Sequence, residues 1–191
     1  MPTQSRLHRP LARHITAQAQ SAQQVEGLQV IAGVVFRARK RKPADAPAAR
    51  LAIAEQPALI ASLDRDGHRA ITDAAWQGDA ASVALMLELG FDPATPGHDS
   101  GTALHCAAWQ GSADTVAALL RAPAVLALLV VRDATYDSTP LGWCCHGSIN
   151  GPHGAEYAQV ARLLLEAGAR VEVLDGSEEV EAVLTGWSAT S

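Results

Sequence analysis

Three runs of apolar residues between positions 83 and 165 are typical of buried helices. A pair of small residues precedes each run and lets two helices approach closely: Ala74-Ala75, Ala107-Ala108 and Cys144-Cys145. The runs contain Val83, Leu85, Met86, Leu87 and Leu89; Val116, Leu119 and Leu120; and Val160, Leu163, Leu164 and Leu165. Gly90 and Gly168 stand where a left-handed cap would end the first and the third helix. Each helix pair leaves an apolar face uncovered, so we expect the pairs to stack.

The segments that carry these pairs are copies of one another. Ala74-Ala75-Trp76-Gln77-Gly78 recurs as Ala107-Ala108-Trp109-Gln110-Gly111, a shift of 33 residues that the apolar runs share. A third copy, Thr139-Pro140-Leu141-Gly142-Trp143-Cys144-Cys145, parallels Thr102-Ala103-Leu104-His105-Cys106-Ala107-Ala108 at a shift of 37. Self-similarity at such a period predicts a repeat architecture.

The repeated unit resembles the ankyrin repeat, which has a 33-residue period and a Thr-Pro-Leu-His opening. The resemblance covers about residues 69–171 and is closest in the second copy, where Thr102, Leu104, His105, Ala107, Ala108 and Gly111 fall on the pattern. The first copy has Arg69-Ala70-Ile71-Thr72 at the opening, and the third has Gly142 in the His position and inserts residues 149–154. The runs at 75–76, 85–93 and 139–143 are similar to a small bacterial type of ankyrin protein.

The resemblance implies an all-α solenoid of about three stacked helix–turn–helix repeats with a capping helix unit at each end. We divide the chain into a basic extension and linker (1–47), an N-terminal cap (48–68), repeats at 69–101, 102–138 and 139–173, a C-terminal cap (174–187) and a tail (188–191). Ser177 is the predicted N-cap of the last helix. The apolar run Ala124–Val131 is interpreted as a longer turn packed on the stack, with a strand as the alternative.

Composition agrees with this fold. Hydrophobic residues make up 48% of the 191 residues but aromatic residues only 4%, which favours closely packed small helices over a β-sandwich. Three cysteines, Cys106, Cys144 and Cys145, cannot form a disulfide framework, so we expect an intracellular, cytoplasmic protein.

Charge divides the chain in two. Residues 1–42 carry a formal charge of +7, whereas the remaining residues carry −12. Five cations, which we call the basic arm, follow the apolar run Val30–Phe36: Arg37, Arg39, Lys40, Arg41 and Lys42. That run is far shorter than the roughly 20 residues that cross a bilayer, and it lacks a signal-peptide cleavage site. We expect a flexible or partly helical extension, with a transit peptide as the alternative. The arm would meet nucleic acid, an anionic membrane or the acidic part of the chain itself.

Catalytic patterns are weak. His105, Cys106, Cys144, Cys145 and His146 lack a C-x-x-C pair, and Asp99-Ser100-Gly101 lacks the G-x-S-x-G nucleophile elbow. No phosphate-binding loop or H-E-x-x-H motif occurs. We therefore expect no catalysis, no metal, no cofactor and no small-molecule substrate. By the resemblance, His105 is structural and bonds to neighbouring backbone.

In the ankyrin family, ligands are commonly held by the turn tips and by the two residues after the Ala-Ala pair, on the concave side. Here those residues are Trp76, Gln77, Trp109 and Gln110, with His146 as the counterpart in the third copy; the tips are Asp99, Ser100, Tyr136 and Asp137. Tryptophan is enriched at binding hot spots. The alternative is that both indoles pack against each other or under the turns, and Trp143 is expected in the core. We predict a protein-binding module without catalytic activity, with attachment through the basic arm as the alternative function.

Overall fold

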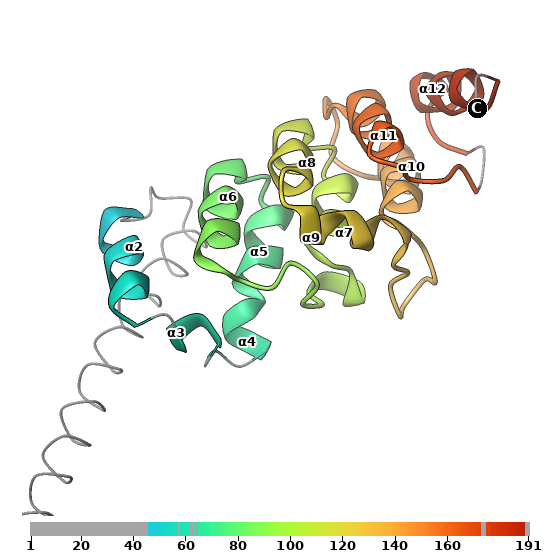
Figure 1. The fold of residues 1–191 in the computed structure, drawn as a ribbon. Helices are drawn as coiled ribbons and strands as arrows, with labels where there is room; N and C mark the ends of the chain where they lie inside the picture. Colours follow the sequence, from blue (N-terminus) through green and yellow to red (C-terminus); the bar gives the residue numbers. More distant parts are fainter. Residues whose placement is uncertain (1–45, 57, 62, 64, 173–174, 190–191) are drawn as a thin grey trace, which may run out of the picture.

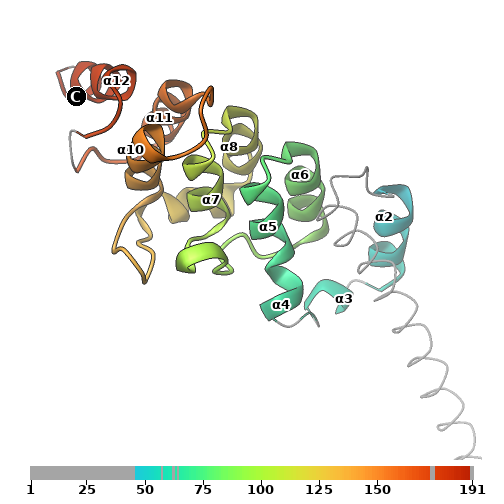
Figure 2. The same cartoon turned by 180° about the vertical axis from the view of Figure 1, so that it is seen from behind.

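The computed structural model describes residues 46–56, 58–61, 63, 65–172 and 175–189, and every regular element among them is a helix. The helices follow one another along a single stack, from α2 at one end to α12 at the other (Figures 1 and 2). The expected all-α solenoid is confirmed. The basic arm lies outside the described residues.

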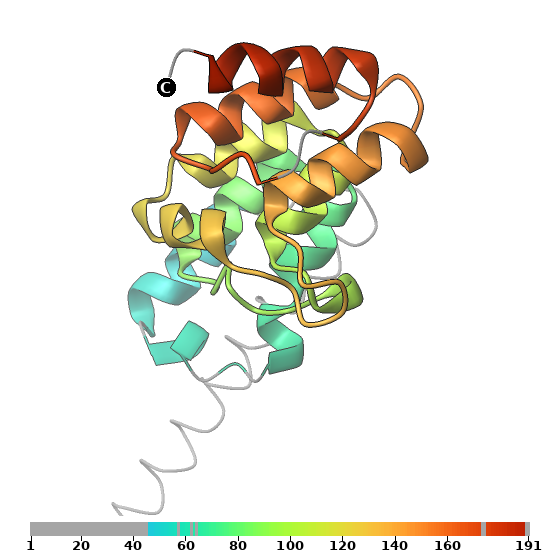
Figure 3. The ribbon, with the colours of Figure 1, turned by 90° about the vertical axis from the view of Figure 1, so that its right-hand side faces the viewer.

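Successive helix pairs form the body of the stack: α5 (Ala70–Trp76) with α6 (Ala80–Leu89), α7 (Ala103–Trp109) with α8 (Ala113–Leu120), and α10 (Pro140–Asn150) with α11 (Tyr157–Glu166). The first helices of the pairs pack on one another in one row, and the second helices form the other row. Viewed along the stack, the loops that precede α7 and α10 project to the same side (Figure 3).

Small side chains let the first row of helices pack closely. Ala74, Ala75, Ala107, Ala108 and Cys144 are each at most 1% exposed. The second row contributes larger buried side chains to the same core: Val83, Met86, Val116, Leu119, Val160 and Leu164. Burial of this kind is non-directional, so the stack needs further contacts to fix the order and angle of its pairs.

Local capping explains where several helices begin and end. Asp79 caps α6 by accepting a hydrogen bond from the Ser82 N–H at 3.0 Å. Gly90 ends α6 with φ +91°, in the left-handed region that favours glycine. Gly168 follows α11 with φ +108° and has the same function. The two glycine caps expected from the sequence are confirmed.

Further helices cover both ends of the stack. Before α5 lie α2 (Ala46–Glu55), α3 (Ala58–Ala61) and α4 (Arg65–His68), and α2 packs on α6. Arg50 of α2 binds Glu88 of α6 through two hydrogen bonds of 2.5 and 2.7 Å. At the other end α12 (Glu178–Ser188) packs on α11.

The residue before α12 differs from the sequence prediction in one respect. Ser177 occupies the N-cap position, but its side chain makes no capping hydrogen bond. Its backbone N–H donates instead to Ser148 Oγ of α10, at 2.8 Å. Ser177 therefore links α12 to the preceding repeat through its backbone and does not cap the helix with its side chain.

The apolar run after α8 packs on the stack as expected, but it is helical, which corrects the expected longer turn and its strand alternative. It forms α9 (Pro123–Leu126) and a 3₁₀ helix, η2 (Ala127–Val130), because Pro123 suits the first turn of a helix. Val125, Leu128 and Leu129 are buried against the stack. Among the described residues no single helix is long and apolar enough to cross a membrane; α8 and residues 123–130 reach that length only together, across a bend of 109°.

The turn at Gly111 provides a test of how tightly adjacent repeats fit. Gly111 has φ +59°, and an added Cβ would lie 2.6 Å from the Cβ of Ala155. We expect Gly111→Ala to lower the free energy of unfolding by about 2–3 kcal/mol, from backbone strain together with this clash. Gly154→Ala is the matched control, because Gly154 has φ +75° and nothing within 4 Å of the added Cβ. Urea denaturation should show a clearly smaller loss of unfolding free energy for the control, of about 1 kcal/mol. Equal losses for the two variants would contradict a close fit between adjacent repeats at Gly111.

Candidate functional site

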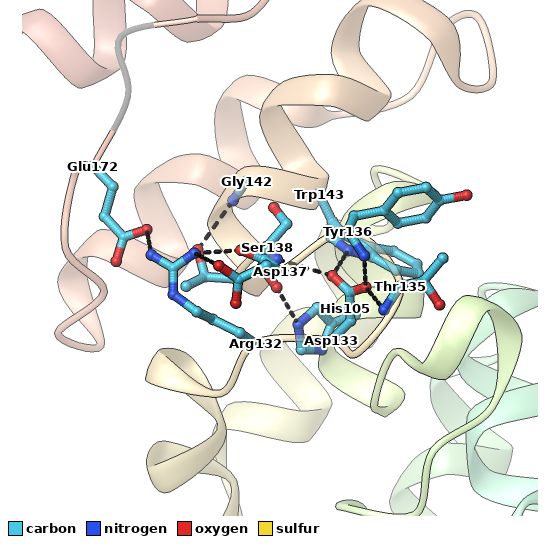
Figure 4. Close-up of polar contacts among 11 residues, drawn as sticks. His105, Arg132, Asp133, Thr135, Tyr136, Asp137, Ser138, Gly142, Trp143 and Glu172 are labelled. Atoms are coloured by element: carbon cyan, nitrogen blue, oxygen red, sulfur yellow. Dashed lines mark hydrogen bonds and ion pairs between the residues drawn. The ribbon is translucent and has the colours of Figure 1, made fainter.

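The loop of residues 131–138, which precedes α10, is folded around one buried carboxylate (Figure 4). Asp133 is 3% exposed, and its Oδ1 accepts hydrogen bonds from the N–H groups of Thr135 and Tyr136, at 2.8 and 2.6 Å. Its Oδ2 accepts from the Ser138 N–H at 3.1 Å and from the indole Nε1–H of Trp143 at 2.9 Å. The carboxylate thus fixes both the loop and the Trp143 ring.

These donors keep Asp133 ionised. Burial alone would raise the pKa of Asp133, but hydrogen bonds from the Tyr136 N–H, the Trp143 indole, and the Ser138 and Thr135 N–H groups outweigh it and lower the pKa below its ordinary value. A negative charge therefore lies at the N–H edge of the Trp143 indole at neutral pH.

His105 joins the second helix pair to the same loop. Its ring is fully buried, and Nδ1 accepts a hydrogen bond from the Thr102 N–H at 3.1 Å. Because Nδ1 is the acceptor, Nε2 carries the proton and donates a hydrogen bond to the backbone oxygen of Ser138, at 3.1 Å. Burial lowers the pKa of His105, so the ring is neutral. His105 therefore bonds to neighbouring backbone, as the resemblance implied.

The two projecting loops are held to each other as well. The first contains the 3₁₀ turn η1 (His98–Ser100), and its Ser100 Oγ accepts a hydrogen bond from the Ala134 N–H at 3.0 Å. Ser100 Oγ also lies 2.8 Å from Thr135 Oγ1. Asp99 and Ser100 have φ of +45° and +60°, a left-handed conformation that Asp tolerates better than most residues. The tip of the first loop is thus anchored to the second.

Aromatic rings gather between these loops and the first row of helices. Trp143 is 5% exposed, and both Trp109 and Tyr136 contact it at steep angles: their ring centroids are 6.3 and 6.2 Å away, with interplanar angles of 78° and 65°. His146 lies 5.5 Å from the Trp109 ring. One repeat earlier, Trp76 stacks on His98 of η1 at 4.4 Å and 23°.

Together these side chains line a pocket of about 400 Å³. Trp76 comes from α5, Asp99 from η1 and Trp109 from α7. The second loop and α10 complete the wall with Tyr136, Ser138, Gly142, Trp143 and His146. We call this cavity the aromatic pocket. It spans three successive repeats, so the stack must form before the pocket exists.

The predicted binding residues divide into two groups. Trp76, Trp109, His146, Asp99 and Tyr136 line the aromatic pocket. Gln77 and Gln110 follow α5 and α7 as half-buried cap residues, and Ser100 joins the two loops; none of the three lines the pocket. Asp137 is exposed, lies 3.6 Å from Arg132 and lines a neighbouring cavity of about 220 Å³.

Trp143 was expected in the core, and it is both buried and part of the pocket wall. Its position corresponds to Cys106 in the preceding repeat, which is fully buried. The larger side chain of Trp143 was a usable signal that this position differs from that of Cys106, since an indole cannot occupy the space of a thiol. Asp133, Ser138 and Gly142 carried no comparable signal, because their contacts depend on how the second loop folds.

The cysteines and Ser100, which were first considered for catalysis, lie in surroundings that favour a structural role. Burial raises the pKa of Cys106 to about 12 and of Cys145 to about 11, and it raises that of Cys144 as well, which disfavours a reactive thiolate. Within the described ranges no group of three or more His, Cys, Asp or Glu side chains is arranged to hold a metal ion. Ser100 bonds to the second loop and to the Asp99 carbonyl.

Comparison with known proteins agrees with the fold. The family model described as Ankyrin repeat matches residues 101–128, which contain Thr102, His105 and the whole of α7 and α8. No curated protein matches the chain. The helix pairs on either side of the matched segment have the same arrangement and pack directly on it. Ankyrin repeats are general protein–protein interaction modules and are typically non-catalytic. The chain therefore contains an ankyrin repeat at residues 101–128.

Proposed function

We propose that this chain binds a protein partner at the aromatic pocket, on the face formed by α5, α7, α10 and the two loops before α7 and α10. The observation that carries the proposal is that Trp76 and Trp109, from successive repeats, line one cavity together with Tyr136 and His146. Tyr136 is 64% exposed, and both indoles remain half-buried. Exposed aromatic side chains around a cavity are the usual anchors of protein interfaces.

The contacts of the two indoles favour this proposal over a purely structural role. Among ring contacts of the described residues, Trp76 pairs with His98, and Trp109 pairs with Trp143 and His146; none joins the two indoles to each other. Each ring is therefore held by partners other than the second indole, Trp76 by η1 and Trp109 by α10, and both rings line the shared cavity. Side chains fixed in this way lose little conformational entropy when a partner binds.

The proposal predicts that the two indoles carry the binding energy. We expect Trp76→Ala combined with Trp109→Ala to weaken partner binding at least 30-fold, since a hot-spot tryptophan contributes about 2 kcal/mol or more. The matched control is Leu51→Ala combined with Leu126→Ala, which removes two exposed apolar side chains outside the pocket. Partners would be captured from a lysate of the source cell and quantified by mass spectrometry. Thermal melting would establish that both variants fold.

The same experiment tests attachment through the basic arm. A third variant replaces Arg37, Arg39, Lys40, Arg41 and Lys42 by serine, and every capture is repeated at low and high salt. Binding through the arm depends on neutralising phosphate or lipid charges, so it would fall steeply with salt. Recovery of nucleic acid or anionic lipid that requires the arm, together with unchanged protein capture by the tryptophan variant, would contradict the proposal.

A further inference from the structure

We infer that the aromatic pocket binds an arginine or lysine side chain of the protein partner. The inference rests on the proposed function and specifies the chemistry of the occupant. Three properties of the pocket support it: the arrangement of its rings, the sign of its charges and its size.

The rings meet at steep angles and so form a corner. Trp109 and Tyr136 are inclined at 78° and 65° to Trp143, with centroid separations of 6.3 and 6.2 Å. A group that enters the angle between two such rings contacts the face of at least one of them. Ring faces carry the negative part of the aromatic quadrupole, which attracts cations within about 6 Å, most strongly over tryptophan.

The charges around the pocket have one sign. Asp99 lines the cavity, and no lysine or arginine is among its lining residues. Asp133 accepts a hydrogen bond from the Trp143 indole N–H at 2.9 Å, which places a second carboxylate at the edge of that ring and increases the ring's attraction for a cation. Arg132 of the second loop lines the adjacent cavity instead and binds Glu172 at 2.6 Å and the Asp137 carbonyl. A negatively charged side chain would therefore meet neither an arginine nor a lysine among the lining residues, and it would lie close to Asp99.

The volume of the aromatic pocket suits a long side chain. The cavity of about 400 Å³ lies in the range of small-ligand sites, about 300–1,000 Å³. Arginine and lysine combine a charged end with an apolar stem that packs along aromatic surfaces. The half-buried indoles of Trp76 and Trp109 offer such a surface in the same cavity as Asp99.

Binding can be followed on the indole protons of the full-length chain. Its four tryptophans include Trp187 of α12, which lies outside the pocket and serves as an internal reference. The probes are the peptides acetyl-Gly-Ser-X-Ser-Gly-amide, in which X is arginine, lysine, norleucine or glutamate. Two-dimensional ¹H–¹⁵N NMR titrations measure the dissociation constant from each indole signal. We expect arginine or lysine to bind about tenfold tighter than norleucine and to shift Trp76, Trp109 and Trp143 but not Trp187.

Two variants separate charge from shape. Trp109→Leu keeps an apolar wall but removes the ring face, so the preference over norleucine should fall to about twofold or less. Asp99→Asn removes the carboxylate, and asparagine tolerates the left-handed φ of +45°; we expect about threefold weaker binding of the cationic peptides. Asp114→Asn, at an exposed position of α8, is the matched control and should leave binding unchanged.

Several results would overturn the inference. Equal binding of norleucine and arginine, or preferred binding of glutamate, would show that the pocket does not select a cation. If the peptides bind only after Arg37, Arg39, Lys40, Arg41 and Lys42 are changed to serine, the occupant is the basic arm of the same chain. If the inference fails while the Trp76 and Trp109 double variant still loses its partner, the proposed function stands. Cation binding with partner capture unaffected by that variant would instead overturn the proposed function.

Discussion

Replacing His105 by alanine is expected to lower the free energy of unfolding by about 4 kcal/mol, because it creates a cavity and breaks two buried hydrogen bonds. The ring is fully buried between α7 and the loop before α10. Its loss would leave the Thr102 N–H and the Ser138 carbonyl without their partner at the junction of two repeats. A change of this size is a large part of the stability of an ordinary domain.

A second substitution separates the two causes. His105→Phe keeps an aromatic ring in the space but removes both hydrogen bonds, so we expect a loss of about 2 kcal/mol. Urea denaturation of both variants gives the comparison. Losses below about 1 kcal/mol for His105→Ala would show that the ring does not join the repeats.

Acid should weaken the native protein through the same residue. Burial lowers the pKa of His105 in the folded state, so below the ordinary histidine pKa of about 6.5 the unfolded chain binds a proton that the folded chain does not. The stability contributed by the neutral ring therefore falls as the pH drops from 7 to 5. His105→Phe should lack this part of the pH dependence.

The second large effect is expected for Asp133→Asn, which should lower the free energy of unfolding by about 3 kcal/mol. Each carboxylate oxygen accepts two N–H donors. An asparagine amide group must turn its NH₂ toward one of these donor pairs, so two hydrogen bonds to a charged acceptor are lost. Trp143 and Tyr136 lose their support at the same time, so binding at the aromatic pocket should weaken as well.

Asp137→Asn is the matched control in the same loop. Asp137 is exposed and has φ +52°, which asparagine tolerates, so we expect a change within about 0.5 kcal/mol. The pKa of Asp133 is lowered in the folded state, so its contribution is present above the ordinary aspartate pKa of about 3.9 and is lost as the pH falls below it. Urea denaturation at neutral pH and in acid measures both effects. Equal stability of the two asparagine variants would contradict the role assigned to Asp133.

Both residues connect the fold to the candidate site. His105 and Asp133 are buried polar groups that each bond to the loop before α10, and that loop supplies Tyr136 and Ser138 to the pocket. These hydrogen bonds hold the loop in place without a partner, which reduces the entropic cost of binding.

The repeat pattern was predictable because it is set by local spacing. The recurrence of Ala-Ala-Trp-Gln-Gly, the glycine caps at Gly90 and Gly168, and the Thr102–His105 opening all depend on residues within one repeat. The placement of Trp76 and Trp109 in one pocket follows from the same period, since equivalent positions of stacked repeats lie side by side.

Features that depend on contacts between distant segments were not predictable. Ser177 is of a residue type that commonly caps helices through its side chain. Its backbone N–H instead donates a hydrogen bond to Ser148, which belongs to the preceding repeat. Trp143 was assigned to the core alone, because nothing in the sequence indicates that Asp133 would hold its indole at the pocket wall. The helical form of residues 123–130 depends on burial of Val125, Leu128 and Leu129 against the stack, which outweighs the β-propensity of the valines in this run.

Photo-crosslinking from within the aromatic pocket tests the central claim most directly. Benzoylphenylalanine at Tyr136, an exposed pocket residue, replaces one aromatic side chain by another, and the same probe at Leu126 samples an exposed site outside the pocket. The account predicts a protein adduct from position 136 that disappears when Trp76 and Trp109 are changed to alanine, and none from position 126. An adduct from position 126 alone, or one at position 136 that persists without the two indoles, would contradict it.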